Sequence, residues 1–311
     1  MMLMCLVCAA LCAAPETSPA PAAPAASVHR AQIAIRDPFV LPVKDEGLYY
    51  MYGTNPARGA KSFLCYTSAD LETWTGPIPV FTPPEHFWAD RQFWAPEVHV
   101  WEGRYYLFAS YSNTEKQNRG TQIAVADSPR GPFIPLGTAA QTPAGWLCLD
   151  GTLFVDGEGK PWMVFCHEWV QVEDGEIQAL PLARDLSKAD GPPVLLFRAS
   201  EAPWVRDRKD KVTDGPFLHR TADGTLLMLW SSFGHDGKYK TGLARSLSGK
   251  LGGPWRQEPA PVFEADGGHA MIFTGFDGVR RMALHAPNKS PSRPVFLTIS
   301  ESGGSLRVKT N

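Results

Sequence analysis

RDPFVLPVKDEGLYYMYGT, residues 36–54, is the first of five stretches of this sequence that follow one pattern. Each stretch begins with a polar lead residue, continues as a short apolar run, turns at a glycine and returns as a second apolar run. The other four are APEVHVWEGRYYLFASYS (95–112), LDGTLFVDGEGKPWMVFCHEW (149–169), TDGPFLHRTADGTLLMLWSSFG (213–234) and GHAMIFTGFDGVRRMALHAPN (268–288). The turn glycines are Gly47, Gly103, Gly159, Gly224 and Gly278. Asp-Gly and Glu-Gly pairs between β-branched and aromatic runs indicate β-hairpins.

The lead residues recur at similar intervals along the chain. They are Asp37, Glu97, Asp150, Asp214 and His269, and they lie 60, 53, 64 and 55 residues apart. A repeat of this length matches one four-stranded propeller blade, and no segment shows a sustained helical period. The sequence therefore predicts an all-β protein, a five-bladed β-propeller with four-stranded antiparallel blades. A β-sandwich is the alternative, but it does not require a polar lead residue in every unit.

The segments between the hairpins also repeat. TSADLETWTGP, ADSPRGPF, ARDLSKADGPP and ARSLSGKLGGPW each combine a stretch bearing Ser or Asp with a later Gly-Pro. Gly and Pro mark turns because each favours a particular backbone geometry. We expect these segments to form the turn between the third and fourth strands of a blade.

The N-terminal residues 1–26 differ in composition from the rest of the chain. A short apolar run, MMLMCLVCAALCAAP, precedes a stretch rich in Pro and Ala. This predicts a signal peptide and a flexible linker, followed by a single propeller domain over residues 27–311. The run is too short to span a bilayer, so we expect an exported protein, periplasmic or extracellular. A lipoprotein anchor on Cys5, Cys8 or Cys12 is the alternative.

Composition excludes some classes of protein and partner. A formal net charge of -2 argues against a nucleic-acid-binding protein, which would carry a basic face. Three cysteines follow the leader, Cys65, Cys148 and Cys166, without the spacing of a zinc site. We expect them to be buried apolar residues. We also expect a monomer with no membrane span.

The lead residues point to a reaction at the propeller axis. The innermost strand of each blade lines the axis, so aligned repeats would place the five lead side chains in one ring. Several carboxyl groups around one cavity raise the pKa of at least one of them. Glycoside hydrolysis requires such a division, with one protonated carboxyl acting as acid and one ionised carboxylate acting as base. Turn capping is the alternative for any single Asp.

The motifs RDPFV, FWAPEV, LDGTLFVDGEGKPWMVF and DGPFL, and more loosely GGHAMIF, resemble those of glycoside hydrolase family 43. The resemblance runs from about Ile33 to the C-terminus. It implies an inverting propeller enzyme of arabinan and xylan breakdown, with Asp37 as general base and Asp150 as the residue that tunes the pKa of the acid. The general acid of the family is usually Glu, and its position here holds Asp214. Because Asp is one methylene shorter, Glu168 and Glu201 are the alternative donors.

Other residues of the expected site follow from the same resemblance and from side-chain chemistry. We expect Trp94, Glu97, Glu168 and Trp169 to contact the substrate, since flat aromatic faces suit sugar rings. The resemblance assigns His269 to a central ion or water. No cofactor is expected to be required, and a structural calcium ion at His269 would be held mostly through water.

The sequence therefore predicts a secreted glycoside hydrolase. Its expected substrates are plant-type polysaccharides or oligosaccharides with arabinosyl or xylosyl linkages. A non-catalytic carbohydrate-binding propeller is the main alternative, and the Asp at position 214 is what supports it. A protein-binding scaffold is a third, weaker alternative, because such scaffolds seldom carry carboxylates on the axis.

Overall fold

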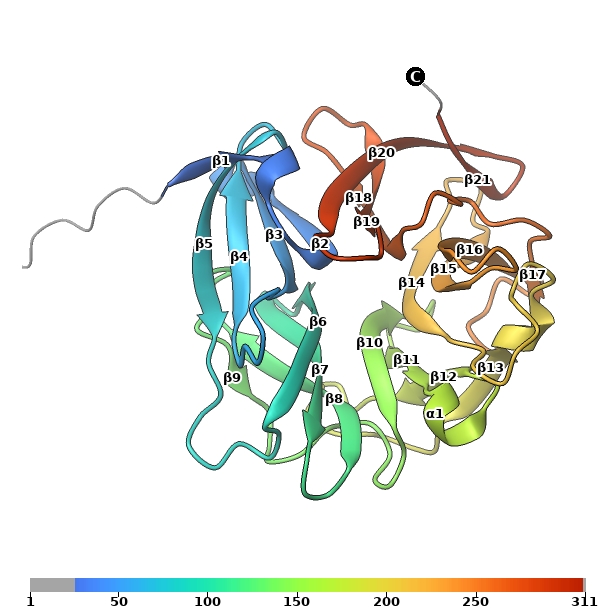
Figure 1. The fold of residues 1–311 in the computed structure, drawn as a ribbon, viewed down its shortest axis with the longest axis horizontal. Helices are drawn as coiled ribbons and strands as arrows, with labels where there is room; N and C mark the ends of the chain where they lie inside the picture. The colour runs from blue at the N-terminus through green and yellow to red at the C-terminus, as the bar shows by residue number, and fades with distance from the viewer. Residues whose placement is uncertain (1–25, 310–311) are drawn as a thin grey trace, which may run out of the picture.

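The computed structural model describes residues 26–309 and contains five antiparallel β-sheets around one axis, as Figure 1 shows. The predicted five-bladed propeller is confirmed. The predicted signal peptide and most of the linker, with the three leader cysteines, lie outside the described residues. None of the described helices is long and apolar enough to cross a bilayer.

Each blade is built from one continuous segment of the chain. Blade 1 contains β2 (Arg36–Val43), β3 (Leu48–Thr54), β4 (Phe63–Ser68) and β5 (Thr73–Phe81), and β1 (Ser27–His29) adds a fifth strand beside β5. Blade 2 contains β6 (Arg91–Trp101), β7 (Arg104–Asn113), β8 (Asn118–Ala126) and β9 (Ile134–Pro135). Blade 3 contains β10 (Cys148–Val155), β11 (Pro161–His167), β12 (Glu176–Pro181) and β13 (Val194–Arg198).

The remaining blades follow the same order. Blade 4 contains β14 (Asp214–Arg220), β15 (Leu226–Phe233), β16 (Tyr239–Ser246) and β17 (Trp255–Gln257). Blade 5 contains β18 (Gly268–Thr274), β19 (Arg280–Ala286), β20 (Arg293–Ser302) and β21 (Ser305–Val308). The helical elements are short: α1 (Trp169–Val172), η1 (Arg30–Gln32), η2 (Lys44–Glu46) and η3 (Ala199–Glu201).

The turns fall largely where the sequence predicts them. All five predicted turn glycines adopt positive φ between the first and second strands of their blades. The outer Gly-Pro pairs lie between the third and fourth strands in blades 2, 3 and 4. In blade 1 the prediction is wrong, because Gly76 and Pro77 lie inside β5. There the turn forms earlier, where Asp70 Oδ1 accepts the amides of Glu72 and Thr73.

Buried side chains fill the space within and between blades. In the largest cluster the rings of Phe63, Phe81, Phe93 and Tyr111 pack with centroids 5.0–6.3 Å apart. Such aromatic packing removes large apolar areas from water and fixes neighbouring blades against each other. The three cysteines predicted to be buried apolar residues are buried and unpaired.

The innermost strand of every blade carries a β-bulge at its start. In β2, for example, Arg36 pairs with Thr54 and the next pair is Phe39 with Tyr52. The residue that follows the last pair before this bulge adopts a left-handed conformation in each blade; these residues are Asp37, Ala95, Asp150, Gly215 and His269, with φ of 47–56°. A bulge redirects a side chain relative to the regular strand.

The bulges correct the predicted alignment of the repeats. Asp37, Asp150 and His269 are equivalent, as expected, but Glu97 and Asp214 are not. Glu97 lies two residues after the bulge residue Ala95, and Asp214 lies one residue before Gly215. The prediction is wrong at these two positions because acidity is not the shared property of the bulge position.

A ring of hydrogen bonds joins neighbouring blades at the bulges. The residue paired before each bulge lies on the second strand, and these residues are Thr54, Ser110, Cys166, Ser231 and His285. Four of them accept the bulge amide of the next blade: Ala95 N to Thr54 Oγ1 (2.7 Å), Asp150 N to Ser110 Oγ (2.7 Å), His269 N to Ser231 Oγ (2.8 Å) and Asp37 N to His285 Nδ1 (3.2 Å). Cys166 breaks the series, and the Gly215 amide donates to Asp150 Oδ2 instead (3.0 Å).

Blade 5 closes the ring against blade 1 without exchanging a strand, so that red and blue strands lie side by side in Figure 1. The Arg36 guanidinium donates to the backbone oxygen (2.5 Å) and to Oδ1 (2.9 Å) of Asn288. The Ile35 amide donates to the Ser292 carbonyl (3.2 Å). Tyr49 stacks on Phe276 with centroids 4.2 Å apart. Side chains and single backbone bonds therefore close the propeller.

Candidate active site

A cavity of about 610 Å³ opens on the axis at the end where the innermost strands begin. We call it the axial cavity. Every residue predicted for the site lines it except Glu97 and the alternative donor Glu201. The lining residues are Arg36, Asp37, Thr54, Trp94, Arg119, Leu149, Asp150, Glu168, Trp169, Val170, Arg206, Asp210, Val212, Asp214, Phe233, Tyr239 and His269.

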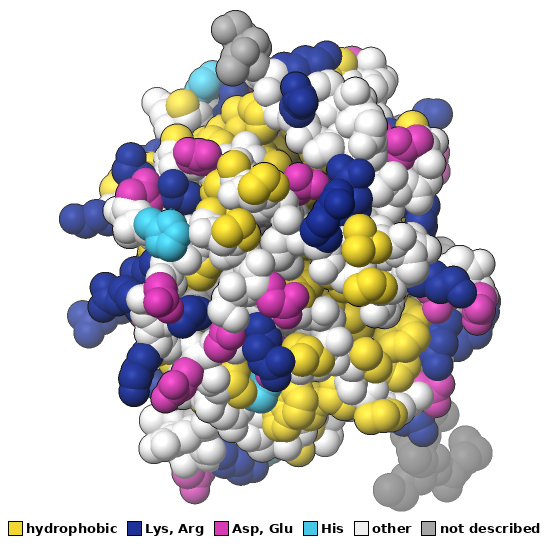
Figure 2. All heavy atoms as spheres, turned by 90° about the vertical axis from the view of Figure 1, so that its right-hand side faces the viewer, with side chains coloured by type: hydrophobic (Ala, Val, Ile, Leu, Met, Phe, Trp, Pro, Cys, Tyr) yellow, Lys and Arg dark blue, Asp and Glu magenta, His cyan; other side chains and the backbone are white. Residues whose placement is uncertain are grey.

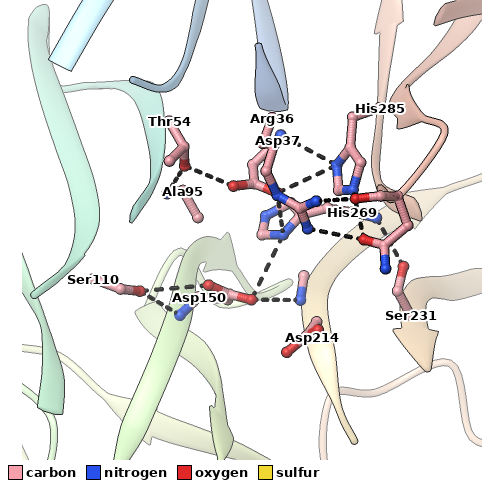
Figure 3. Close-up of polar contacts among 12 residues, drawn as sticks. Arg36, Asp37, Thr54, Ala95, Ser110, Asp150, Asp214, Ser231, His269 and His285 are labelled. Carbon is pink, nitrogen blue, oxygen red and sulfur yellow. Dashed lines mark hydrogen bonds and ion pairs between the residues drawn. The ribbon is translucent and has the colours of Figure 1, made fainter. Parts of the chain in front are cut away.

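Asp37 lies at the floor of the axial cavity, where blades 1 and 5 meet (Figure 3). Its Oδ2 accepts a hydrogen bond from Thr54 Oγ1 (2.6 Å), and its Oδ1 lies 3.5 Å from His269 Nδ1 and 3.3 Å from His285 Nδ1. Burial alone would raise the pKa of Asp37, but His269, then His285 and Arg36, outweigh it. They hold the pKa well below its usual range, so this carboxylate is ionised.

Asp150 faces Asp37 from the start of β10 in blade 3. Ser110 Oγ donates to its Oδ1 (3.4 Å), the Gly215 amide donates to its Oδ2, and His269 Nδ1 lies 3.6 Å from Oδ2. Burial, together with the charge of Asp37, raises the pKa of Asp150 although His269 opposes the rise. Asp150 therefore connects the bulge residues of blades 3, 4 and 5.

Asp214 lies beside Asp150, at the start of β14 (Figure 3). Burial first, and then the charge of Asp150, raise the pKa of Asp214 to about 7. Its Oδ2 accepts a hydrogen bond from the hydroxyl of Tyr239 (2.9 Å), which opposes this rise. No cation among the described residues lies within ion-pair distance of Asp214. Asp37 is therefore ionised near neutral pH, and Asp214 keeps its proton to a much higher pH than Asp37 does.

His269 occupies the centre of the cluster. Burial alone would lower its pKa, but the charges of Asp150 and Asp37 raise it above its ordinary value. Its ring packs flat on Gly215, where an added Cβ would lie 2.8 Å from the ring atom Cγ. Gly215 also has a φ of 51°, so glycine suits this position for both its conformation and its space. His269 Nε2 is buried without a partner among the described residues.

The chemistry of His269 fits a water molecule better than a calcium ion. Calcium takes six to eight oxygen ligands, and a protonated imidazole has no free lone pair. Residues 26–309 contain no cluster of three or more His, Cys, Asp or Glu side chains that could hold a metal ion. These donors do not by themselves make a calcium site, so an ion here would be held through water.

Arg119 forms one wall of the axial cavity together with Glu168 and Trp94. Its guanidinium pairs with the Glu168 carboxylate and lies over the Trp94 ring, 5.1 Å from the centroid. It also donates to Ser112 Oγ (2.9 Å) and to Gln92 Oε1 (2.8 Å). These contacts hold Arg119 in one place. Burial raises the pKa of Glu168, and Arg119 opposes that rise.

The opposite wall contains a second ion pair. Arg206 pairs with Asp210 and lies over the ring of Phe233, 4.5 Å from its centroid. Arg206 Nε and Asp210 Oδ1 are buried without hydrogen-bond partners among the described residues. Arg208 Nε lies 3.5 Å from Asp210 Oδ1, so two arginines neutralise this carboxylate.

Two predicted residues lie outside the axial cavity. The carboxylate of Glu97 is buried and bonds to His99 Nε2 (2.9 Å), so the structure gives it no contact with a ligand there. Glu201, the other candidate donor, accepts the backbone amide of Arg198 at the start of η3 (2.9 Å). Neither residue is placed to donate a proton in the cavity.

Sequence reasoning missed several residues that line the cavity. Tyr239, Arg119, Arg206 and Asp210 come from third strands, or from the loop before β14, which the hairpin pattern does not reach. Only the start of the first strand is marked in each repeat. Thr54 could have been found, because its equivalents Ser110 and Ser231 are also small hydroxyl residues.

The outer surface is distinct from this acidic cavity. On the side of the molecule that lies at the right of Figure 1, Lys and Arg side chains are interspersed with Asp and Glu (Figure 2). This side carries no field of one sign. In contrast, several carboxyl groups, including those of Asp37, Asp150 and Asp214, lie close together in the axial cavity.

Comparisons with known proteins match most of the propeller. The family model of glycosyl hydrolases family 43 matches residues 31–300. The crystal structure of an endo-arabinase from Bacteroides thetaiotaomicron is 45% identical with a TM-score of 0.85, covering 89% of this chain and 98% of that one.

Curated relatives are similar over shorter segments. A xylosidase/arabinosidase 43A of Humicola insolens is 29% identical over 127 residues, 41% of this chain and 36% of the relative. The extracellular endo-alpha-(1->5)-L-arabinanase 1 of Bacillus subtilis is 25% identical over 136 residues, 41% of this chain and 42% of the relative. The chain thus matches less than half the length of each of these two relatives.

Proposed function

The chain belongs to glycosyl hydrolases family 43, and on that premise we propose that it hydrolyses O-glycosidic bonds of arabinosyl or xylosyl glycans with inversion at the anomeric carbon. The observation that carries the proposal is a single cavity that holds two carboxyl groups in opposite electrostatic surroundings. The His269 imidazole beside Asp37 lowers the pKa of that carboxyl, whereas burial and the charge of Asp150 raise the pKa of Asp214. Paired carboxyls whose environments separate their pKa values are suited to acid and base roles.

In the proposed mechanism, Asp37 accepts a proton from a water molecule that attacks the anomeric carbon. Asp214 donates its proton to the oxygen of the leaving group as the glycosidic bond breaks. After one turnover Asp37 is protonated and Asp214 ionised, and exchange with solvent restores both. Asp150 bonds to the Gly215 amide and lies close to His269, so its charge sets how strongly Asp214 holds its proton.

Asp214 is a better candidate for the acid than Glu168. Glu168 pairs with Arg119, and a guanidinium in contact stabilises the ionised form of a carboxyl. Asp214 has only a neutral tyrosine hydroxyl in contact, so it keeps its proton to higher pH. The hydrogen bond from the Tyr239 hydroxyl holds the shorter Asp214 side chain in one position.

The substrate class rests on the relatives and on the walls of the cavity. The similar proteins are described as an endo-arabinase, a xylosidase/arabinosidase and an arabinanase. Trp94 and Trp169 line the cavity and offer aromatic faces for a pentose ring. We further propose export of the chain, chemistry without a cofactor, and water or a water-held ion at His269.

The test compares two substitutions on aryl glycosides with good and poor leaving groups. Asp214→Asn should abolish activity on the poor leaving group and retain much more on the good one, because only the former needs protonation. Asp37→Asn should reduce both by about 10²-fold or more. Equal loss on both substrates for Asp214→Asn would reject it as the acid.

Two further readouts complete the test. Nuclear magnetic resonance of the first product formed should show inverted anomeric configuration. Binding of oligosaccharides by the wild-type chain, without turnover of any arabinosyl or xylosyl substrate, would instead support a non-catalytic carbohydrate-binding propeller.

A further inference from the structure

A second hollow opens on the same face of the propeller, between blades 2 and 3. It has a volume of about 170 Å³, and we call it the radial pocket. Its lining includes Trp88, Lys116, Asn118, Arg119 and Trp146, with small residues between them. No described Asp or Glu lines it, in contrast to the axial cavity. Aromatic rings suit the apolar face of a sugar, and the Lys116 ammonium and the Arg119 guanidinium can donate hydrogen bonds to sugar hydroxyl oxygens.

The walls of the radial pocket are formed before any ligand arrives. The loop between β9 and β10 packs flat on Gly120, where an added Cβ would lie 2.6 Å from Ala140 Cβ and 2.6 Å from Thr142 Oγ1. The Gln141 side chain accepts the Ile123 amide (2.9 Å) and donates to the carbonyls of Leu136 and Ser187. A loop held this firmly loses little conformational entropy when a ligand binds.

The two tryptophans are fixed in orientation. Trp146 stacks on His167 with centroids 4.2 Å apart and an interplanar angle of 13°, and it is only partly buried. Trp88 Nε1 donates to Gln122 Oε1 (2.6 Å), and its carbonyl accepts from Asn113 Nδ2 (2.6 Å). Rigid, partly exposed indole rings are good platforms for the apolar face of a sugar.

Arg119 connects the two hollows. It lines both the axial cavity and the radial pocket. Its contacts with Glu168, Gln92 and Ser112 fix it as the partition between them. A linear glycan that leaves the axial cavity between blades 2 and 3 would cross Arg119 and reach Trp146.

We propose that the radial pocket is a subsite for a further sugar unit of the same glycan chain. The inference rests on the proposed function and extends it, because it makes a linear oligosaccharide or polysaccharide, rather than a short glycoside, the substrate. The chain is held by stacking on the two tryptophans and by hydrogen bonds from Lys116 and Arg119 to its hydroxyl oxygens.

Binding to the inactivated Asp37→Asn variant tests the subsite directly. Linear α-1,5-arabino-oligosaccharides and β-1,4-xylo-oligosaccharides of increasing length are titrated by calorimetry. We expect affinity for one series to rise with length until the chain fills the radial pocket. Adding Trp146→Ala should reduce affinity for the longest chain about tenfold and affinity for the shortest much less.

Two further variants keep the test independent of folding. Ala144→Tyr fills the radial pocket from an exposed position and should reproduce the loss without removing a buried side chain. Trp101→Ala is the matched control, since Trp101 lies at the far end of β6, away from this face. It should leave the dependence on chain length intact.

The outcomes separate this inference from the proposed function. Affinity that does not rise with length, or a rise that survives both Trp146→Ala and Ala144→Tyr, overturns the subsite. A subsite that binds as expected in a chain whose wild type cleaves no glycoside overturns the proposed hydrolysis instead.

Discussion

Tyr239 contacts both ends of the proposed catalytic system. Its hydroxyl donates to Asp214 Oδ2, and its ring stacks on His285, 5.8 Å between centroids, whose Nδ1 lies next to Asp37. An O–H donor on Oδ2 leaves the acidic proton on Oδ1. In the proposed mechanism, Tyr239 is thus a positioning residue that selects the oxygen from which the proton is transferred.

Tyr239→Phe keeps the ring and removes this donor. We expect the basic limb of the pH profile, set by the pKa of Asp214 at about 7, to move to higher pH, because the hydroxyl stabilises the carboxylate. Activity on a poor leaving group should fall about tenfold, more than on a good one. Tyr52→Phe is the control, since the Tyr52 hydroxyl bonds to the Pro129 carbonyl away from the cavity. An unshifted basic limb would contradict this role.

The raised pKa of Asp214 also affects stability. A carboxyl with a folded-state pKa above its unfolded value destabilises the protein as pH rises through that pKa, because the ionised form is buried. Asp214→Asn should therefore increase the free energy of unfolding by about 2–4 kcal/mol at pH 8 and by little at pH 4. Denaturant titrations at both pH values measure this. An equal gain at both pH values would show that the pKa of Asp214 in the folded protein is not raised as we infer.

At the scale of the strands, the bulges and their partners determine where the catalytic side chains lie. Ser231 on β15 accepts the His269 amide and so joins blade 4 to blade 5. The next residue, Ser232, is equally buried, but its Oγ has no partner among the described residues. Adjacent serines on one strand therefore have different roles.

Ser231→Ala should leave a buried amide without a partner and cost about 1–3 kcal/mol of stability. Ser232→Ala should change stability by less than about 0.5 kcal/mol. Thermal unfolding of the two variants measures the difference. A loss for Ser232→Ala as large as that for Ser231→Ala would refute the proposed inter-blade bond.

The strands also explain which features of the structure could be predicted from the sequence. Hairpin signals recur because turn geometry depends on nearby residues, so the blades could be predicted. The bulge could not be assigned by matching acidic residues, since Ala95 and Gly215 hold it in blades 2 and 4. A small residue or proline follows the bulge in every blade: Pro38, Pro96, Gly151, Pro216 and Ala270. That pattern would have aligned the repeats correctly. The walls from third strands and loops could not be predicted, because their position depends on the closed ring.

For the whole molecule, the junction of blades 1 and 5 is distinctive, because the chain does not run from one to the other across it. Asn288→Ala removes the Oδ1 acceptor of Arg36. It should cost about 1.5–3 kcal/mol, the range for hydrogen bonds to charged groups. Hydrogen exchange should become faster in β2 and β18, with less change in β10–β12.

The control is Asn55→Ala, because Asn55 bonds only within blade 1, to Ser62 and Ala57. Uniform acceleration across all blades in Asn288→Ala would mean that the propeller opens as one unit and not at this junction.

The same junction can form only late in synthesis, because a chain made from its N-terminus completes blade 1 first and blade 5 last. Asp37 is among the first residues of the propeller to be synthesised, yet the imidazoles that keep it ionised, His269 and His285, belong to the last blade. Until blade 5 docks, Asp37 lacks the two groups that lower its pKa. A chain truncated before residue 268 would carry Asp37 without His269 and so lack the proposed base, and hydrolysis would therefore show that blade 5 had been made and had docked.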